Sequence, residues 1–446
     1  MDQTYMKEQP VLKLIVSMAL PMVISMMVSS LYNIVDSFFI ARISEDAMTA
    51  LSLVYPVQNL INAVMIGFGI GINAVISFYL GAQDKKMADR AATQLLGTIH
   101  GVGFMILGIA VMRPFLQMFT GNAQIVDYGV RYSRIAFLFA TALSWQLVFE
   151  KTFQAVGRMV ESMTCMMSGA IINIILDPIF IFALGMGVKG AALATVLSQT
   201  VGAVWILRFL TGRKTILRLK RSNMHLDPKV FGPCLALGIS TFVMLSTESL
   251  LSISFTSSLS RFGGDVAVGA MTIITSISQL VTLPLQGICQ GGQPIISYNF
   301  GANKPDRVKK AFFTQFCTCV IYTTLFWLVV MIFPKAFATI FTSDKELVTY
   351  SAWALRIYMA GIFSLGFQVS CQQSFMALGQ AKVSLLLACL RKIVLLIPLI
   401  FILPNFFDNK VFAVFLAEPV SDIIAAAVTT ITFFTLFNSI LKKEKR

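Results

Sequence analysis

The chain has 446 residues, of which 57% are hydrophobic and 13% are charged, and its mean hydropathy is +0.78. Soluble domains carry about a quarter charged residues. The sequence therefore lacks the surface of a soluble protein of this length, and the same composition excludes a disordered chain. Two histidines and seven scattered cysteines leave little material for a metal site or a disulfide framework. These numbers predict an all-α, polytopic membrane protein.

The net charge of +14 would suggest nucleic-acid binding in a soluble protein. Here the Lys and Arg residues lie in short segments between apolar runs, as the positive-inside rule produces in membrane proteins. We therefore expect a lipid bilayer as partner and no nucleic acid.

Twelve apolar runs reach the length of about 20 residues that a membrane span requires. Several are longer and contain prolines such as Pro21, Pro56 and Pro178, which remove a backbone hydrogen bond and bend helices. The predicted spans are 14–40, 47–80, 91–112, 126–149, 160–185, 189–210, 231–260, 266–298, 311–334, 346–376, 383–404 and 411–440.

The distribution of basic residues predicts the orientation. If both termini share a side, that side receives 25 of the 35 Lys and Arg residues, with Arg391 and Lys392 counted as loop residues. Cytoplasmic loops carry the excess of basic residues. We therefore expect an even number of spans and two cytoplasmic termini.

The two halves of the sequence resemble each other. The segment Ile76-Ser-Phe-Tyr-Leu-Gly-Ala-Gln83 matches Ile296-Ser-Tyr-Asn-Phe-Gly-Ala-Asn303 at an offset of 220 residues. Thr152-Phe-Gln-Ala-Val-Gly157 matches Ser374-Phe-Met-Ala-Leu-Gly379 at an offset of 222. Each half would hold six spans, so the repeat predicts two parallel lobes, residues 1–220 and 221–446. Two such lobes are suited to transport by alternating access.

Acidic residues inside membrane spans are rare and usually mark a path for ions or substrate. The candidates within the predicted spans are Asp36, Asp177, Glu248, Glu418 and Asp422. At about 1.5 Å per residue, Asp36 lies roughly 6–8 Å below the outer boundary, Asp177 roughly 12–14 Å and Thr195 roughly 9–11 Å.

Three spans thus bring oxygen-bearing side chains to similar depths in one lobe, and Asn173 lies one turn from Asp177 on the same helix face. Two carboxylates crowded in low dielectric raise each other's proton affinity, so the arrangement suits a proton relay or a small hard-cation site. The alternative is ordinary hydrogen bonding between helices, and Thr195 can also bond its own helix backbone. In the repeat, Asp36 corresponds to Phe255 and Asp177 to the apolar stretch near Leu399, so the acids belong to one lobe only.

Three motifs together resemble the multidrug and toxic compound extrusion (MATE) family of drug/cation antiporters. They are Asn33-Ile-Val-Asp36, Asn173-Ile-Ile-Leu-Asp177-Pro-Ile-Phe-Ile and the duplicated Gly-Ala loop. The resemblance extends over nearly the whole chain and is closest to the bacterial branches with MepA-like and DinF-like members. It implies a twelve-helix fold in two pseudo-symmetric six-helix lobes, located in the bacterial cytoplasmic membrane.

The resemblance also implies site residues and partners. The ion-coupling positions of the family fall on Asp36, Asn173, Asp177 and Thr195, where H⁺ or Na⁺ would bind, and the bend associated with switching falls on Pro21. Small organic cations and drugs are the implied substrates. We expect no catalytic residue, no cofactor beyond the coupling ion, no other metal, no ATP, and a monomer.

Other polar residues in the spans have weaker signals. Glu248 and Asp422 are candidates for a second polar centre, although the tenth span lacks the aspartate that a sodium-coupled branch of the family pairs with the seventh-span glutamate. Candidates to line a substrate cleft, with ordinary interhelical bonding as the competing explanation, are Asn33, Gln58, Gln146, Gln279 and Gln293.

Two other features of the sequence limit the remaining functions. Gly67-Phe-Gly-Ile-Gly71 imitates a nucleotide loop, but it lies in an apolar run and predicts close helix packing instead. The two histidines, His100 and His225, lie far apart in the sequence, which disfavours a membrane-embedded lipid-modifying enzyme. A flippase for lipid-linked oligosaccharides and a channel are also compatible with a polytopic chain, but we expect a secondary antiporter.

Overall fold

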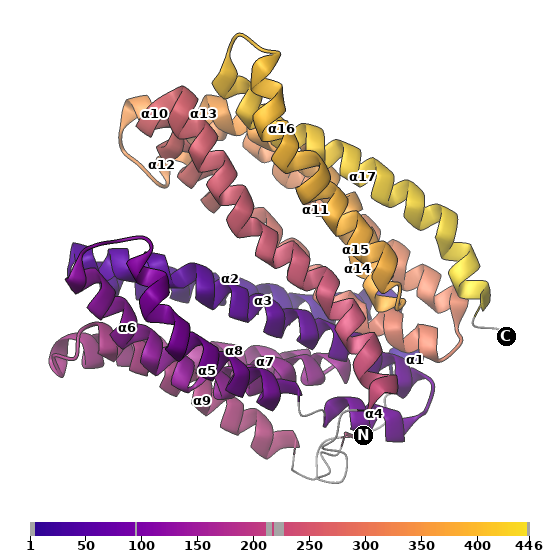
Figure 1. The fold of residues 1–446 in the computed structure, drawn as a ribbon. Helices are drawn as coiled ribbons and strands as arrows, with labels where there is room; N and C mark the ends of the chain where they lie inside the picture. The colour runs from indigo at the N-terminus through magenta and orange to yellow at the C-terminus, as the bar shows by residue number, and fades with distance from the viewer. Residues whose placement is uncertain (1–4, 94–95, 211–215, 218–226, 444–446) are drawn as a thin grey trace. The chain divides into compact units, whose positions relative to one another are not determined.

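The computed structural model describes residues 1–446 except 1–4, 94–95, 211–215, 218–226 and 444–446 (Figure 1). Every element in the described part is a helix. The first half contains α1 (Tyr5–Glu8), α2 (Val11–Ala41), α3 (Glu45–Gly81), α4 (Lys85–Ala92), α5 (Leu96–Gln117), α6 (Ala123–Leu138), α7 (Ala140–Ala155), α8 (Met159–Pro178), η1 (Ile179–Ala183) and α9 (Val188–Leu210). The second half contains α10 (Pro228–Gly301), α11 (Pro305–Ile332), α12 (Pro334–Thr339), α13 (Lys345–Tyr358), η3 (Met359–Ser364), α14 (Leu365–Ala377), α15 (Ala381–Cys389), η4 (Leu390–Leu396), α16 (Ile397–Ile402), η5 (Leu403–Asn405) and α17 (Lys410–Lys443).

The helices match the predicted spans. Among the described residues, nine helical stretches are long and apolar enough to cross a membrane. One of them, α10, holds two predicted spans, because the backbone at Gly264 is non-helical (φ 66°) and divides it. The helix α5 overlaps the predicted span 91–112 with a shift of five residues, and the consecutive helices α6 and α7 contain the predicted span 126–149. The prediction of an all-α membrane fold is confirmed.

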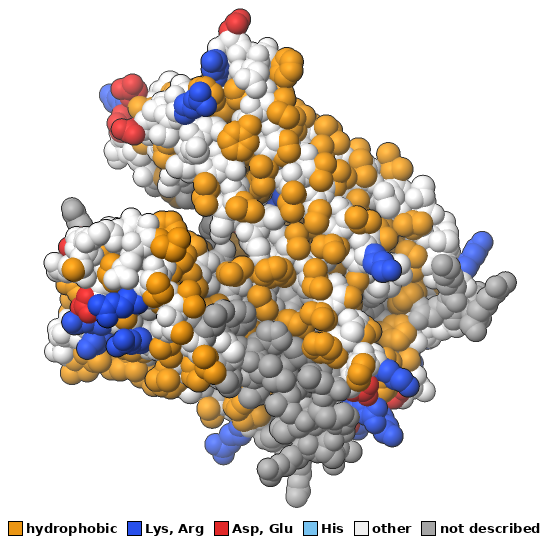
Figure 2. All heavy atoms as spheres, viewed as in Figure 1, with side chains coloured by type: hydrophobic (Ala, Val, Ile, Leu, Met, Phe, Trp, Pro, Cys, Tyr) orange, Lys and Arg blue, Asp and Glu red, His pale blue; other side chains and the backbone are white. Residues whose placement is uncertain are grey.

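Large apolar side chains remain exposed along the helices. On α11, for example, Ile321, Leu325 and Ile332 are each about 60% exposed (59%, 58% and 60%). Hydrophobic side chains cover the long faces of the helices in Figure 2, whereas charged side chains gather mainly near helix ends. Such a surface is unfavourable in water and matches the hydrocarbon of a bilayer.

The internal repeat is also present in the backbone geometry. Gln83 and Asn303, the last residues of the duplicated Gly-Ala motif, both have positive φ (61° and 52°). The hydroxyl of Ser77 donates to the carbonyl oxygen of Ala155 at 3.1 Å, and Ser297 donates to Ala377 in the same way at 2.7 Å. Equivalent residues therefore make equivalent contacts in both halves.

The chain forms two compact units that exchange the beginnings of their first helices. The first unit comprises Met1–Tyr5 and Ile24–Ile239, and the second comprises Met6–Val23 and Ser240–Arg446. The start of α2 thus belongs to the second unit and the start of α10 to the first. The lobes predicted from the sequence, 1–220 and 221–446, do not include this exchange, because it depends on contacts between distant segments.

In each unit, a glycine on one helix makes close backbone contact with the exchanged segment. A Cβ at Gly71 of α3 would lie 2.2 Å from the carbonyl oxygen of Cys234 on α10. In the second unit, a Cβ at Gly291 of α10 would lie 2.5 Å from the Cα of Ala19 on α2. Gly71 and Gly291 are separated by 220 residues, the offset of the repeat. The prediction of close helix packing at Gly67-Phe-Gly-Ile-Gly71 is confirmed, and the repeat applies it twice.

Hydrogen bonds fix the entrance of each exchanged segment. In the second unit, Arg307 donates to the carbonyl oxygens of Met6 and Gln9 at 3.0 and 2.9 Å. In the first unit, Arg90 pairs with Asp227, one residue before α10, at 2.9 Å. Each arginine thus fixes the start of the first helix of the other repeat.

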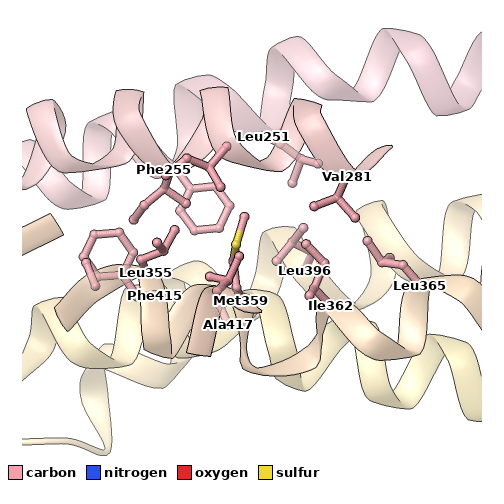
Figure 3. Packing of buried hydrophobic residues seen from close by; sticks show 14 of the residues in the cluster. Leu251, Phe255, Val281, Leu355, Met359, Ile362, Leu365, Leu396, Phe415 and Ala417 are labelled. Carbon is pink, nitrogen blue, oxygen red and sulfur yellow. The ribbon is translucent and has the colours of Figure 1, made fainter. Parts of the chain in front are cut away.

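The core of the second unit is an apolar cluster between α10, α13, η3, η4 and α17 (Figure 3). Phe255 of α10 is 2% exposed and lies 5.7 Å, centroid to centroid, from the ring of Tyr358. Leu399, the position matched to Asp177, packs against the same cluster. The positions that correspond to the acids of the first lobe are therefore apolar core in the second.

One assumption of the charge count was wrong. Arg391 and Lys392 are not loop residues, because they lie in η4 within the apolar stretch Ala381–Asn405. Without them, 23 of the 35 basic residues remain on the side predicted to be cytoplasmic. The predicted span 383–404 already contained both, but consecutive basic residues were interpreted as a loop signal.

The glycine contacts predict a stability difference between two kinds of glycine. We expect Gly71→Ala and Gly291→Ala to destabilise the protein by about 1–3 kcal/mol, because the added methyl meets backbone atoms that cannot move aside. The control is Gly232→Ala on α10, where a Cβ meets nothing within 4 Å. Thermal unfolding of the purified variants measures the difference, and equal melting temperatures for all three would contradict the packing argument.

Candidate functional site

The candidate site is a pair of acidic side chains inside the first unit. Asp177 of α8 is fully buried and Asp36 of α2 is half-buried. Their carboxyl groups lie within hydrogen-bond reach of each other. Two carboxylates can only accept, so this hydrogen bond exists only when one of them carries a proton. The Oδ1 atoms of both residues are buried and have no other partner.

The backbone after Asp177 explains its position. Pro178 has no N–H to donate, and the helix continues as the π-helical turn η1 (Ile179–Ala183). Single π-helical turns within α-helices are frequent at functional sites. Gly190 of α9 lets η1 approach closely, since a Cβ there would lie 2.7 Å from the carbonyl carbon and oxygen of Phe180. The glycine thus brings α9 against the end of α8.

Asn173 connects the acids to α9. Its amide is 1% exposed and lies 3.3 Å from the hydroxyl of Thr195. With the amide nitrogen turned toward Asp177, it donates to Asp177 Oδ2 at 3.1 Å and its oxygen accepts from the Thr195 N–H at 3.3 Å. The Thr195 hydroxyl donates to the backbone oxygen of Ala191 at 3.1 Å. All four predicted ion-coupling residues therefore meet in one place.

An apolar layer closes one end of this site. Ile40, Ile181 and Ala191 form a buried cluster, each 3% exposed or less, with Phe39 packed against it. Ile40 lies one helical turn after Asp36, Ile181 one turn after Asp177, and Ala191 one turn before Thr195. All three therefore lie on the side of the site where α2 ends at Ala41, η1 ends at Ala183 and α9 begins at Val188. Buried apolar side chains therefore lie between the acids and these helix ends.

The donor set limits what the site can bind. Two carboxyl groups, one amide and one hydroxyl can hold a proton, and their oxygens are the ligands that Na⁺ would need. Among the residues that the structure describes, no group of three or more His, Cys, Asp and Glu could hold a metal ion.

Glu248 and Asp422, the candidates for a second polar centre, belong to one network in the second unit. The Lys392 ammonium pairs with the Glu248 carboxylate and donates to the backbone oxygen of Met244 at 2.6 Å. The adjacent Arg391 pairs with Asp422 at 2.7 Å.

Two further residues complete this network. Arg391 also pairs with Glu418 at 3.3 Å, and the Ser421 hydroxyl donates to the backbone oxygen of Arg391 at 2.9 Å. The basic members were missed from the sequence because they had been counted as loop residues, although their place inside a predicted span was the signal.

A further buried polar cluster lies at the end of α7. The Lys151 ammonium is 3.5 Å from Glu150 and donates to the side chain of Gln154 at 3.0 Å. The amide of Gln154 donates to Glu150 at 2.7 Å and to Ser162 at 3.2 Å. Because these groups satisfy one another, the cluster joins α7 to α8 and is structural.

The predicted cleft residues have different environments. Gln58 donates to the Tyr132 hydroxyl at 3.4 Å, which is an interhelical bond. Gln146 is half-buried against Gly202, with its buried Oε1 lacking a partner. Gln279 is exposed, Gln293 is 2% exposed, and the side chain of Asn33 lies outside the described ones. A role in a cleft stays a prediction for all five.

Pro21, the predicted bend, lies inside α2, which continues through it from Val11 to Ala41. The segment Met6–Val23 belongs to the second unit, and Pro21 lies two residues before its end. Proline weakens a helix at the turn before it. The weak point of α2 therefore lies where the helix passes from one compact unit to the other.

Comparison with known proteins finds a matching family model and similar curated proteins. The family model MatE matches residues 21–179 and 240–402. The chain is 26% identical over 412 residues to the multidrug export protein MepA of Staphylococcus aureus strain N315, covering 90% of this chain and 89% of that protein. It is 25% identical over 428 residues to MepA of Staphylococcus haemolyticus strain JCSC1435, covering 94% of each.

A solved structure shares the fold. The crystal structure of MATE in complex with MaL6 superimposes with a TM-score of 0.94 at 23% identity, covering 99% of this chain and 100% of that one. Because the family model matches well over half of the residues in two stretches, one in each repeat, the chain belongs to the MatE family.

Proposed function

We propose that this protein is a secondary antiporter that exports amphipathic, cationic organic molecules in exchange for inward movement of H⁺. The observation that carries the proposal is the Asp36–Asp177 pair, whose carboxyl groups come within hydrogen-bond reach in a buried site. The MepA relatives are multidrug export proteins by name, which supports drugs as the substrate class. We place the protein in a bacterial cytoplasmic membrane with both termini in the cytoplasm.

A shared proton explains the geometry of the acid pair. Without it, two negative charges would face each other in a medium of low dielectric, where repulsion is strong. With it, one carboxyl group donates to the other and the buried oxygens are partly satisfied. Proton uptake therefore draws α2 and α8 together, and proton release drives them apart.

The path of α2 connects this event to the second unit. Asp36 lies in the part of α2 that belongs to the first unit, whereas Met6–Val23 belongs to the second. A change in the position of Asp36 is transmitted along the helix to Pro21, where α2 bends most easily. Protonation and substrate binding then favour different arrangements of the same chain, which is the requirement for exchange.

The apolar layer supplies the gate. With cytoplasmic termini, α2 runs outward, so Ile40 and its neighbours Ile181 and Ala191 separate the acids from the outer solution. Opening of this layer admits protons from outside, and its closure prevents leakage. No chemical conversion of the substrate is part of this proposal.

Removing the exchangeable proton should abolish coupling. We expect Asp36→Asn and Asp177→Asn each to lower efflux of a cationic dye driven by a pH gradient at least tenfold, because an amide cannot release a proton. Asp127→Asn is the matched control, because Asp127 lies on the surface and pairs with Arg131. Dye efflux from energised vesicles measures the rates; normal efflux by well-expressed Asp36→Asn would overturn the site assignment.

The identity of the coupling ion predicts the response to imposed gradients. In liposomes containing the purified protein, we expect an imposed pH gradient to drive uptake of an organic cation and an imposed sodium gradient at equal pH to drive none. Uptake on the sodium gradient alone would instead assign Na⁺ to Asp36, Asn173, Asp177 and Thr195. Absence of uptake with either gradient would contradict antiport.

A further inference from the structure

In the charged network of the second unit, the acidic groups outnumber the basic groups by one. Arg391 and Lys392 contribute two positive charges, and Glu248, Glu418 and Asp422 contribute three negative ones. All five lie in the interiors of α10, the apolar helical stretch Ala381–Asn405 and α17 rather than at their ends. Charged groups at such positions are costly in hydrocarbon unless they are paired or wetted.

The most accessible member of the network is Glu248. The side chains of Lys392 and Asp422 are 6% and 3% exposed, and those of Glu418 and Arg391 are 11% and 16% exposed. Lys392 pairs with Glu248, so the surplus negative charge lies on the two acids that share Arg391. The Glu248 carboxylate is 60% exposed. An ionised group this exposed midway between Pro228 and Gly264 faces water rather than lipid.

The surroundings of Glu248 suit an organic cation. Met244 and Leu245, about one turn earlier on α10, are half-buried apolar side chains. Methionine adapts its shape to varied ligands. A sodium ion would require several oxygen ligands, and among the described residues Glu248 belongs to no group of three or more His, Cys, Asp and Glu that could hold a metal ion.

We propose that the Glu248 carboxylate is a recognition site for a monovalent organic cation and that the Lys392 ammonium is a tethered competitor that occupies it when no substrate is bound. The inference rests on the proposed function only in taking organic cations as the substrate class. When the substrate binds Glu248, Lys392 withdraws and keeps its bond to the Met244 carbonyl oxygen. The charges of the network then balance, because the substrate neutralises Glu248 while Arg391 and Lys392 neutralise Glu418 and Asp422.

Lys392 thereby sets the selectivity of the site. A neutral molecule cannot replace an ammonium group at Glu248, whereas a cation can do so without leaving a buried charge unpaired. The tethered ammonium also neutralises the Glu248 carboxylate when no substrate is bound.

The test is equilibrium binding of tetraphenylphosphonium to the purified full-length protein at fixed pH and salt. We expect Glu248→Gln to weaken binding about fivefold or more, and Lys392→Met to tighten it up to about fivefold, the size of an accessible ion pair. Asp306→Asn, at an exposed position in the first turn of α11, is the matched control and should bind as the wild type does.

A purely structural ion pair gives the opposite pattern. Lys392→Met would then weaken binding as much as Glu248→Gln does, with a similar fall in melting temperature, and this result would overturn the proposal. Exchanging the charges, Glu248→Lys with Lys392→Glu, separates the two roles further. A structural pair recovers binding in the exchanged protein, whereas a recognition site does not, because the carboxylate at 392 is buried.

Two other outcomes would also overturn the proposal: no tetraphenylphosphonium binding by the wild type, or displacement of the probe by sodium chloride but not by potassium chloride. Because the binding assay uses no ion gradient, its result is independent of the gradient tests of Asp36. Gradient-driven efflux that is unaffected by both Glu248→Gln and Lys392→Met would refute this inference and leave the antiport proposal intact.

Discussion

An ionised group inside a bilayer must be paired, protonated or wetted, and this constraint governs both polar centres of the protein. In the first unit, Asp36 and Asp177 face each other without a basic partner in the contacts that define the site. They can approach only by holding a proton. In the second unit, Arg391 and Lys392 supply positive charges, so two of the three acidic charges there are balanced without a proton. The same requirement is thus met by salt bridges in the second unit, whereas in the first we propose an exchangeable proton.

The reciprocal exchange of helix starts gives the chain a means of connecting the two centres. Because α2 begins in the second unit and ends beside Asp177 in the first, a change at the acids acts on a helix that both units hold. The glycines Gly71 and Gly291 hold the exchanged segments against α3 and α10 by backbone contact. Backbone contacts of this kind tolerate sliding less than flexible side chains do, and those at Ala19 and Val23 lie on either side of Pro21.

Much of this arrangement was predictable from the sequence. Helices are rigid and rise by a constant amount per residue, so counting along three spans was enough to predict that Asp36, Asp177 and Thr195 lie at similar depth. The repeat was predictable because similar motifs recur at a nearly constant offset, 220 to 222 residues along the chain. The exchange of helix starts was not, because Gly67-Phe-Gly-Ile-Gly71 indicates a close contact without naming the partner. The Arg391–Lys392 pair was missed for a different reason, since buried and loop arginines look alike until their acidic partners are known.

The difference between the two lobes follows from where each one keeps its charge. Phe255 and Leu399 occupy the positions matched to Asp36 and Asp177; Phe255 lies in the apolar core that Figure 3 shows, and Leu399 packs against the same cluster. Duplication alone would have left acids in both places, and a purely structural need for them would have kept both. Instead the second lobe carries its charges on other turns, with Glu248 toward solvent and Lys392 beneath it. In our proposal one lobe responds to the ion gradient while the other discriminates among substrates by charge, and α2, whose start belongs to the second unit, joins the two.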